Sequence, residues 1–428
     1  MSTAEPPQSA NSASVGGSER RAPRAWGDHA RATGPSLIVH VVFRFAVGGL
    51  ENGLVNLINR LPPKRWRHAV VSLTSVDAQF AERVARDDVQ FVALGKGEGH
   101  AIHLYPRLFR LFRSLAPRIV HTRNLAALEA AVPAWLARVP VRIHGEHGRD
   151  IDDLDGTSVR RRRVRRAFAP FVTRYVAVSP DLAQYLEGEV KIARSRVQQI
   201  WNGVDTETFV PRVGARRPVA GCPFDAAQHW LIGSVGRFDP VKDHATLARA
   251  FVSLVANRPA LRSRARLVLV GDGATRRDVE SILAQAGVAD CAWFAGERHD
   301  VAHVMQGLDC FVLPSLAEGV SNTILEAMAS GLPVVATRVG ANAQLVVDGH
   351  TGRLVPASAH DAMARSIEGY MNDEASVREH GRNARAVVER RFSLDAMVDG
   401  YDDLYGRLCA GASLAGTRAS LSPSRIDA

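Results

Sequence analysis

Several features that define other classes of protein are scarce in this chain. Its four cysteines lie far apart and form no CxxC pair, which argues against a disulfide framework or a zinc site. Aromatic residues make up only 6% of the chain, too few for a platform that stacks single-stranded nucleic acid. No apolar run reaches the roughly 20 residues that span a bilayer, and residues 1–35 lack the apolar core of a signal peptide. We therefore expect neither a secreted nor an integral membrane protein, but a cytoplasmic one.

Positive charge is concentrated in one half of the chain. The 54 Lys and Arg outnumber the 44 Asp and Glu, which gives a formal net charge of +10. Residues 36–205 hold 26 basic against 16 acidic residues and so carry the whole excess, whereas residues 206–428 are nearly neutral. This asymmetry predicts an acidic partner for the first half alone: nucleic acid, anionic lipid or a phosphorylated substrate.

The remaining composition is globular, and 428 residues are too many for one ordinary core. Apolar β-branched runs alternate with helical patterns such as Glu51–Leu61 and Leu125–Ala137. Such an order predicts an α/β fold with parallel sheets covered on both faces. We expect two Rossmann-like, doubly wound domains, which would meet at a cleft, with a boundary in the aperiodic stretch Thr206–Ala227. The expected divisions are a disordered arm (1–35), two domains (36–205 and 206–393), a helix (394–410) and a disordered tail (411–428).

The strongest local pattern surrounds Glu318 and Glu326. After a buried strand, a loop presents Glu318, and Ser321 or Asn322 can cap a short helix that closes at Gly331. The free N–H groups at the start of that helix would attract a phosphate. Because Glu326 lies about a turn inside the helix, the two glutamates could hold opposite ends of an elongated ligand. The alternative is a simple cap with two solvated glutamates.

A second pattern places Arg237 and Lys242 after a strand that ends at Gly236. Two cations beside a glycine turn suit a pyrophosphate, with Arg binding through forked hydrogen bonds and Lys acting as a point charge. This interpretation requires both cations to face the gap between the domains rather than to be buried against neighbouring carboxylates. The alternative is ordinary surface charge.

A glycine pair follows the first strand. Gly48 and Gly49 would let the backbone approach a ligand closely, and Glu51 opens the next helix. The spacing is not that of a dinucleotide fingerprint, so a plain tight turn is the alternative.

Two histidines stand at the end of another strand. His144 or His147 could donate a hydrogen bond to a substrate hydroxyl or accept a proton. Their spacing is not that of a zinc protease and no further ligand is evident, so we expect no metal. We interpret the Asp150–Asp155 run as an acidic turn.

Two segments of the first half are strongly basic. One is a helical pattern with Arg107, Arg110 and Arg113 on a leucine-bearing segment, and the other is the run Arg160–Arg166. A basic amphipathic helix is typical of a membrane surface, and a solvated helical face is the alternative.

Taken together, these motifs resemble the retaining glycosyltransferases of family 4, which have the GT-B fold. Glu318 and Glu326 resemble that family's EX7E pair, Arg237 and Lys242 its phosphate-binding pair, and Gly48-Gly49 its N-terminal glycine loop. The resemblance extends over residues 37–410. The segments around His121, His144 and Ser315 also resemble sugar transferases of bacterial exopolysaccharide clusters associated with the exosortase/PEP-CTERM system.

The resemblance implies a role for each motif. The second domain would bind a nucleotide-sugar donor, and the first a glycan or lipid-diphosphate-linked acceptor at an anionic membrane surface. Arg237 and Lys242 would neutralise the leaving diphosphate, helped by the helix start at Ser321, Asn322 and Thr323. Glu318 would hold the donor sugar and Glu326 the ribose. His147 would touch the transferred sugar, with His144 as its rival. The acceptor-side candidates are His121, Asn124 and His144.

The resemblance also implies that the acceptor attacks on the face from which the diphosphate departs, and that no metal or other cofactor is needed. It further implies that the last helix crosses back to the first domain. Sugar-nucleotide epimerases and glycogen-type phosphorylases share the fold and remain alternatives, although no lysine has a recognisable pyridoxal phosphate setting. A basic nucleic-acid-binding module would explain the charge but not the paired glutamates, so we expect no nucleic-acid partner.

Overall fold

The computed structural model describes residues 34–148, 153 and 156–420, without the side chains of residues 413–420. Nearly all of the expected arm, most of the Asp150–Asp155 run and the last part of the expected tail lie outside the described residues. The two sheets of the chain belong to one unit that begins at Pro35. Among the described residues, no helix is both long and apolar enough to cross a bilayer.

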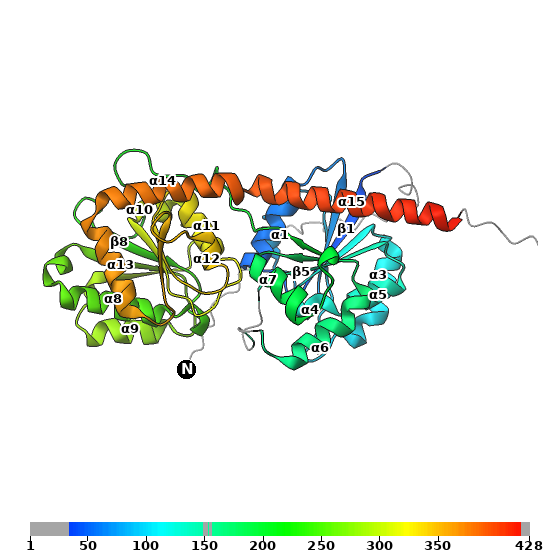
Figure 1. Cartoon of the computed structure of the whole chain (residues 1–428), viewed down its shortest axis with the longest axis horizontal. Coiled ribbons are helices and arrows are strands. Elements are labelled where there is room, and N and C mark those ends of the chain that lie inside the picture. Colours follow the sequence, from blue (N-terminus) through cyan, green and yellow to red (C-terminus); the bar gives the residue numbers. More distant parts are fainter. Residues whose placement is uncertain (1–33, 149–152, 154–155, 421–428) are drawn as a thin grey trace, which may run out of the picture. The chain divides into compact units, whose positions relative to one another are not determined.

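The first sheet has seven parallel strands in the order β3-β2-β1-β4-β5-β6-β7. The central strand β1 is a buried apolar run, in which six of the seven residues are buried, and helices flank the sheet (Figure 1). The strands are β1 (Ser36–Val42), β2 (Trp66–Ser72), β3 (Gln90–Ala93), β4 (Ile119–Arg123), β5 (Val141–Glu146), β6 (Arg174–Ala177) and β7 (Val197–Gln199). The helices are α1 (Gly49–Arg60), α2 (Ala78–Ala81), α3 (Tyr105–Leu115), α4 (Asn124–Leu128), α5 (Ala131–Leu136), α6 (Val159–Phe168) and α7 (Pro180–Gln184).

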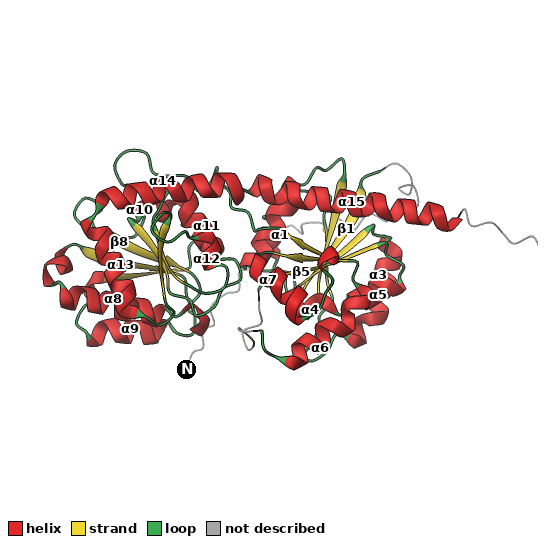
Figure 2. Cartoon of the chain, viewed as in Figure 1, coloured by secondary structure: helices red, strands yellow, loops and turns green. Residues whose placement is uncertain are grey.

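The second sheet has six parallel strands in the order β10-β9-β8-β11-β12-β13, again with helices on both faces (Figure 2). The strands are β8 (Trp230–Val235), β9 (Ala265–Val270), β10 (Ala292–Gly296), β11 (Cys310–Leu313), β12 (Val334–Thr337) and β13 (Gly352–Val355). The helices are α8 (His244–Asn257), α9 (Arg276–Gln285), α10 (Val301–Gly307), α11 (Asn322–Ala329), α12 (Asn342–Leu345), α13 (His360–Asn372), α14 (Glu374–Arg391) and α15 (Leu394–Ser420). The expected pair of doubly wound parallel sheets is confirmed.

The strand orders fix where a ligand site can form. In each sheet the chain starts at a central strand, winds to one edge and then returns to the other side, so the direction reverses between β1 and β4 and between β8 and β11. Loops diverge at the carboxyl ends of such a strand pair and leave a crevice there. The loops after these four strands carry most of the residues that the sequence motifs single out.

Helix α15 returns the chain to the first sheet. Its side chains Leu394, Met397, Tyr401 and Tyr405 are buried against β1, β4, β5 and α1, and Trp66 Nε1 donates a hydrogen bond to Asp402. The helix continues to Ser420. The expectation of a disordered tail that begins at residue 411 is therefore wrong for residues 411–420. The reason is local: alanines follow Gly411 and no proline interrupts the helix before position 423.

Two further elements differ from the sequence prediction. The single helix expected over Leu125–Ala137 is two helices, α4 and α5, because Pro133 has no N–H to donate to the carbonyl four residues before it. Strand β13 was not predicted, since it is short and begins at Gly352. A Cβ at that position would lie 2.3 Å from the carbonyl oxygen of Val334, so the glycine is needed for strand pairing but weakens the sequence pattern.

Candidate active site

The loop after β11 places Glu318 beside a cation from the loop after β8. Glu318 Oε1 accepts hydrogen bonds from Lys242 Nζ at 2.6 Å and from Ser315 Oγ at 2.6 Å. The Glu318 side chain is 8% exposed and that of Lys242 22%. Lys242 ends a short 3-10 helix over Pro240–Lys242, which directs its side chain toward the β11 loop. Lys242 and Glu318, which the sequence analysis assigned to the diphosphate and to the donor sugar, therefore bind each other in the ligand-free chain.

Arg237 remains open to a ligand. Its side chain is 73% exposed and pairs with Asp239 at 3.0 Å. The two expected phosphate-binding cations are thus unequal, since Arg237 is exposed whereas Lys242 is held by a carboxylate. The requirement that neither cation be buried against a neighbouring carboxylate is met by Arg237 and only partly by Lys242.

The start of α11 is capped and touches the glycine loop. Ser321 is the N-cap, because its Oγ accepts a hydrogen bond from the N–H of Ile324 at 3.3 Å. Asn322 Nδ2 donates to the carbonyl oxygen of Gly49 at 3.2 Å, and Asn322 Oδ1 accepts from Asn202 Nδ2 at 3.1 Å. Asn322 therefore joins the second sheet's helix to the loop after β1. The sequence alone gave no reason to single out Asn202.

Glu326 lies inside α11 without a hydrogen-bond partner for its carboxylate among the residues that the structure describes. Burial raises its pKa to about 8. Glu326 is partly exposed, and a carboxyl group with so little solvation is costly to ionise unless a ligand donates hydrogen bonds to it. Its position one turn beyond the loop of Glu318 is the separation that the sequence analysis expected.

Glu51 folds back over the glycine loop. A Cβ at Gly48 would lie 2.3 Å from Glu51 Oε2, and one at Gly49 would lie 3.1 Å from Asn322 Nδ2. A side chain at Gly48 would therefore displace the Glu51 carboxylate, and one at Gly49 would crowd the Asn322 amide. Burial raises the pKa of Glu51, while the positive charges of Arg123 and Arg237 act in the opposite direction.

His147 stands at the end of β5 with one ring nitrogen free. Its backbone N–H donates to Asn124 Oδ1 at 2.8 Å, and its Nε2 is buried without a hydrogen-bond partner. Burial, followed by the charge of Arg123, lowers the pKa of His147 to about 3. A Cβ at Gly319 would lie 2.6 Å from the carbonyl oxygen of His147, so the loop of Glu318 comes directly against this residue.

The other two histidine candidates are engaged inside the first sheet. His144 is completely buried, and its ring contacts Thr122 Oγ1 at 2.9 Å and Glu146 Oε1 at 3.3 Å. His121 is also completely buried, and its Nδ1 bonds to the Tyr405 hydroxyl at 2.8 Å. Neither side chain reaches the surface where a ligand would enter, whereas Asn124 contacts His147 directly.

Arg123, at the end of β4, is a notable residue that the sequence analysis did not select. Its side chain is buried, at 2% exposure, and its Nη1 bonds to His40 Nδ1 at 3.0 Å. Among the described residues it forms no ion pair with a carboxylate. A buried unpaired guanidinium is energetically costly, and here its charge acts on both His147 and Glu51. The one sequence feature that could have identified Arg123 is its position directly before the candidate residue Asn124.

The basic run Arg160–Arg166 is partly structural. Arg165 is buried and pairs with Glu146 at 2.6 Å, while Arg162 pairs with Glu189. Arg166 donates to the carbonyl oxygen of Val190 at 3.0 Å. The run is therefore neither a free cationic patch nor a wholly solvated face. Of the neighbouring acidic run, Asp153 is described, and it accepts a hydrogen bond from the N–H of Ser158 at 2.8 Å.

Two sequence families match the chain on either side of the linker. The profile described as "Glycosyltransferase Family 4" matches residues 47–208, and that described as "Glycosyl transferases group 1" matches residues 230–373. The first match includes the glycine loop and His147, and the second includes Arg237, Lys242 and both glutamates.

Known proteins agree with these matches. EpsF of Bacillus subtilis (strain 168), which its name describes as a glycosyltransferase, is 33% identical over 303 residues, covering 70% of this chain and 78% of EpsF. The UDP-Gal:alpha-D-GlcNAc-diphosphoundecaprenol alpha-1,3-galactosyltransferase of Escherichia coli is 26% identical over 310 residues, covering 70% of this chain and 77% of its own. The crystal structure of Anabaena Alr3699/HepE in complex with UDP and glucose superimposes with a TM-score of 0.72 at 18% identity, over 87% of this chain and 99% of that one. The fold is therefore GT-B, and the chain belongs to glycosyltransferase family 4.

Proposed function

We propose that the protein is a retaining glycosyltransferase that moves a sugar from a nucleotide-sugar donor to a saccharide or lipid-linked acceptor in exopolysaccharide or other cell-surface glycan synthesis. The observation that carries this proposal is the convergence of Arg237, Lys242, Glu318 and the α11 start on one side with His147 on the other. These groups supply cations for a diphosphate and hydrogen-bond acceptors for sugar hydroxyls within one site.

Donor binding exchanges the partner of Lys242. In the ligand-free chain its ammonium is bound by Glu318, and a donor diphosphate replaces that carboxylate. Glu318 is then free to accept hydrogen bonds from the donor sugar, while Arg237 turns from Asp239 to the same diphosphate. Negative charge on the diphosphate grows as the glycosidic bond breaks, so these fixed cations stabilise the transition state more than the bound donor.

Glu326 and His147 contact opposite ends of the nucleotide-sugar donor, the ribose and the transferred sugar. The carboxyl group of Glu326, whose pKa is raised to about 8, accepts hydrogen bonds from the ribose hydroxyls. His147 lies beside the transferred sugar, and its lowered pKa keeps the ring neutral at physiological pH. His144 is not proposed for this role because both of its ring nitrogens are already engaged.

The reaction proceeds with retention of configuration. The bond between the anomeric carbon and the diphosphate oxygen breaks as the acceptor hydroxyl attacks from the same face, and the departing diphosphate oxygen takes the acceptor proton. No protein nucleophile, metal ion or other cofactor is required in this scheme.

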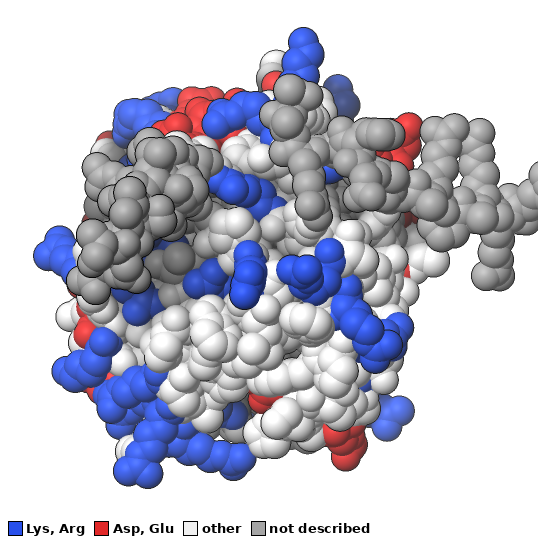
Figure 3. Space-filling model, turned by 90° about the vertical axis from the view of Figure 1, so that its right-hand side faces the viewer, with Lys and Arg blue, Asp and Glu red and all other residues white. Residues whose placement is uncertain are grey.

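The acceptor binds the first domain. Relatives are named for acceptors such as GlcNAc-diphosphoundecaprenol and for lipopolysaccharide core synthesis, and these names favour a saccharide on an anionic or lipid carrier. Helix α3 presents Arg110 and Arg113 to solvent beside the exposed Phe109. Figure 3 shows Lys and Arg side chains spread over this end of the molecule. Basic and aromatic side chains together favour peripheral contact with an anionic bilayer.

The proposal is tested by thermal-shift screening against UDP-, GDP- and ADP-sugars. We expect one base class to raise the melting temperature, and we expect Arg237→Ala and Glu326→Ala to abolish or reduce the shift. Arg277→Ala, which removes an exposed arginine of α9, is the matched control and should keep the full shift. Absence of a shift with every nucleotide sugar, or equal shifts in all variants, would contradict a donor site at these residues.

A further inference from the structure

A second cavity lies at the opposite edge of the second sheet. We call it the amino-edge cavity, because Asp309 and Pro333 in its wall directly precede strands β11 and β12. Its volume is about 420 Å³, within the range of about 300–1,000 Å³ that small-molecule sites occupy. Glu318 and Arg237 follow the carboxyl ends of the same sheet's strands, so this cavity is separate from the donor site.

The wall of this cavity is apolar below and cationic at the rim. Met305, Leu332 and Pro333 contribute apolar surface, and Arg378 and Arg382 of α14 approach from the side. Both arginines are exposed. Among the described residues, Arg378 pairs with Glu374 alone, at 3.2 Å, and Glu374 is itself exposed. Arg382 forms no ion pair or hydrogen bond with any described residue, which leaves its guanidinium free for a ligand.

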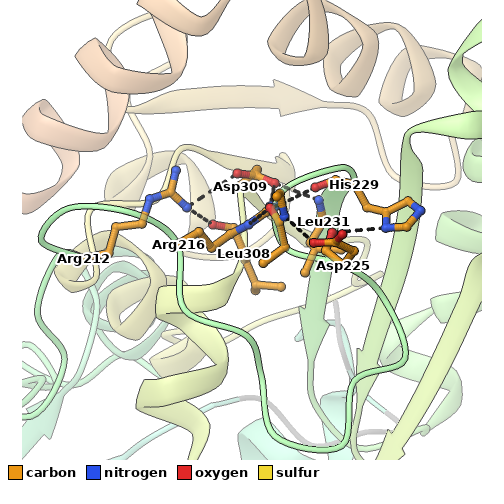
Figure 4. Close-up of polar contacts among 9 residues, drawn as sticks. Arg212, Arg216, Asp225, His229, Leu231, Leu308 and Asp309 are labelled. Atoms are coloured by element: carbon orange, nitrogen blue, oxygen red, sulfur yellow. Dashed lines mark hydrogen bonds and ion pairs between the residues drawn. The ribbon is translucent and has the colours of Figure 1, made fainter.

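The cavity's acidic residues do not cancel this charge. Asp309 accepts from the N–H of Leu231 at 2.8 Å and pairs with both Arg212 and Arg216 (Figure 4). Within the described part of the chain, Arg212 is engaged through Nη1 alone, by Asp309 and by the carbonyl oxygen of Leu308.

Glu389, the other acidic residue of the wall, pairs with Arg385 at 2.7 Å. With both carboxylates occupied, the free donors in the wall are those of Arg212, Arg378 and Arg382. An apolar floor with a cationic rim is complementary to an organic anion, and several arginines in one wall match the geometry of a phosphate group.

The cavity also borders the linker between the two sheets. Arg385 donates to the carbonyl oxygens of Thr206 at 3.0 Å and Phe209 at 2.6 Å. Val204 N–H donates to the carbonyl oxygen of Phe392 at 2.8 Å, so the outgoing and returning chain segments are joined here. A ligand bound to α14 would therefore lie against the segments that link the two halves.

We propose that the amino-edge cavity binds a small phosphate ester with an apolar group, held by Arg212, Arg378 and Arg382, as a site separate from the one that carries out sugar transfer. The phosphate takes the free guanidinium donors, and the apolar group covers Met305 and Leu332. Binding stabilises the junction of the linker with α14 and so raises the stability of the whole chain by mass action.

The test uses phenyl phosphate as the probe, with isothermal titration and thermal shift on the full chain. We expect saturable binding that the neutral analogue benzyl alcohol does not reproduce. Arg378→Gln with Arg382→Gln should weaken it at least about tenfold, because two charge-assisted contacts are lost. Arg390→Gln with Arg391→Gln removes the same charge from exposed positions of the same helix outside the cavity, and should bind normally.

The variant Arg237→Ala tests whether phenyl phosphate binds at the donor site instead of the amino-edge cavity. We expect this variant to bind phenyl phosphate with unchanged affinity even though it loses the nucleotide-sugar response. No binding to the wild-type chain would overturn the proposal, as would equal weakening in both double variants. Loss of binding in Arg237→Ala alone would likewise overturn it and place the probe in the donor site, leaving the glycosyltransferase proposal intact.

Discussion

At the scale of single residues, the pairing of Lys242 with Glu318 is the contact that the proposed donor binding would have to break. In Glu318→Gln the amide no longer competes with a diphosphate for the ammonium, but it also loses the charged acceptor for sugar hydroxyls. We expect affinity for the matching nucleoside diphosphate to stay equal or increase. Transfer should fall at least about 100-fold, the scale seen when one transition-state contact is removed.

Titration calorimetry with UDP, GDP and ADP, alongside a transfer assay, separates these two effects. Lys242→Met is the complementary variant, and it should weaken nucleoside diphosphate binding itself. If Glu318→Gln weakened diphosphate binding as strongly as it reduced transfer, the exchange of partners would be wrong.

The neutral ring of His147 makes stability depend on pH in a defined direction. Its pKa is lowered from an ordinary value of 6.5 to about 3, so below pH 6.5 the unfolded chain binds a proton that the folded chain does not. The stabilisation is fully present above pH 6.5 and is lost as the pH falls from 6.5 toward 3. We expect His147→Gln to flatten the dependence of the unfolding free energy on pH between 6 and 4 by about 1.4 kcal/mol per pH unit.

Chemical denaturation at several pH values measures that slope. The exposed His103 provides the control, and His103→Gln should leave the wild-type slope unchanged. An unchanged slope in His147→Gln would show that this histidine does not stay neutral in the folded chain.

Sequence reasoning selected candidate residues of the second domain but not the network of buried side chains around Arg123. Glu318, Arg237 and Ser321 could be predicted because strand ends, caps and charge spacing are local patterns. Arg123 could not, since its burial and the absence of a partner carboxylate arise only when β1 and β4 lie side by side. The engagement of both ring nitrogens of His144 could not be predicted either, because one contact comes from Thr122 in the neighbouring strand.

At the scale of secondary-structure elements, the cap of α11 links stability to donor binding. Ser321→Ala removes the acceptor for the N–H of Ile324 and should cost about 1 kcal/mol of unfolding free energy. Because the first turn of α11 then frays, we expect weaker nucleotide-sugar binding as well. Ser158 caps α6 in the same manner, so Ser158→Ala should cost similar stability without altering donor affinity, as measured by denaturation and calorimetry. Equal donor affinity in both variants would contradict a role for the α11 start.

The loop after β11 is positioned by the absence of a side chain at Gly319. An added Cβ would lie 2.6 Å from the carbonyl oxygen of His147 and 3.1 Å from Cα of Gly148. Gly319→Ala must therefore push the loop of Glu318 away from the end of β5. We expect transfer to fall at least about tenfold, since small displacements of reacting groups have large effects on rate.

Nucleoside diphosphate affinity should change little in Gly319→Ala, since the cations of the β8 loop are not moved. Gly369→Ala in α13, where nothing lies within 4 Å of an added Cβ, is the neutral control. Transfer at the wild-type rate in Gly319→Ala would show that this contact does not position the site.

Element prediction succeeded where periodic burial dominates and failed where a single backbone feature intervenes. All strands of the two sheets except β13 were predictable from their apolar runs. The division of Leu125–Ala137 followed from one proline, β13 was concealed by one glycine, and the length of α15 was underestimated from a polar, small-residue composition. In each case the boundaries of the element depend on tertiary contacts or on one missing N–H. Neither can be predicted from the hydrophobic pattern alone.

At the scale of the whole molecule, the uneven distribution of charge predicts binding to anionic membranes, which can be tested. The basic excess lies in residues 36–205, but Arg165, Arg162 and Arg166 of α6 are engaged in internal contacts. Arg110 and Arg113 of α3, by contrast, are exposed and available to a membrane.

Exposed apolar side chains accompany this charge. Phe109 of α3 is 37% exposed, and Trp135 of the adjacent α5 is 48% exposed. Since each arginine near an anionic surface contributes about 1 kcal/mol, we expect the chain to float with vesicles that contain phosphatidylglycerol and not with neutral phosphatidylcholine vesicles. Arg110→Glu with Arg113→Glu should weaken flotation at least about tenfold. Arg277→Glu with Arg390→Glu, an equal charge change in the second domain, should leave it unaltered. Equal flotation with both lipids, or equal loss in both double variants, would mean that the charge asymmetry serves acceptor binding rather than attachment to a membrane.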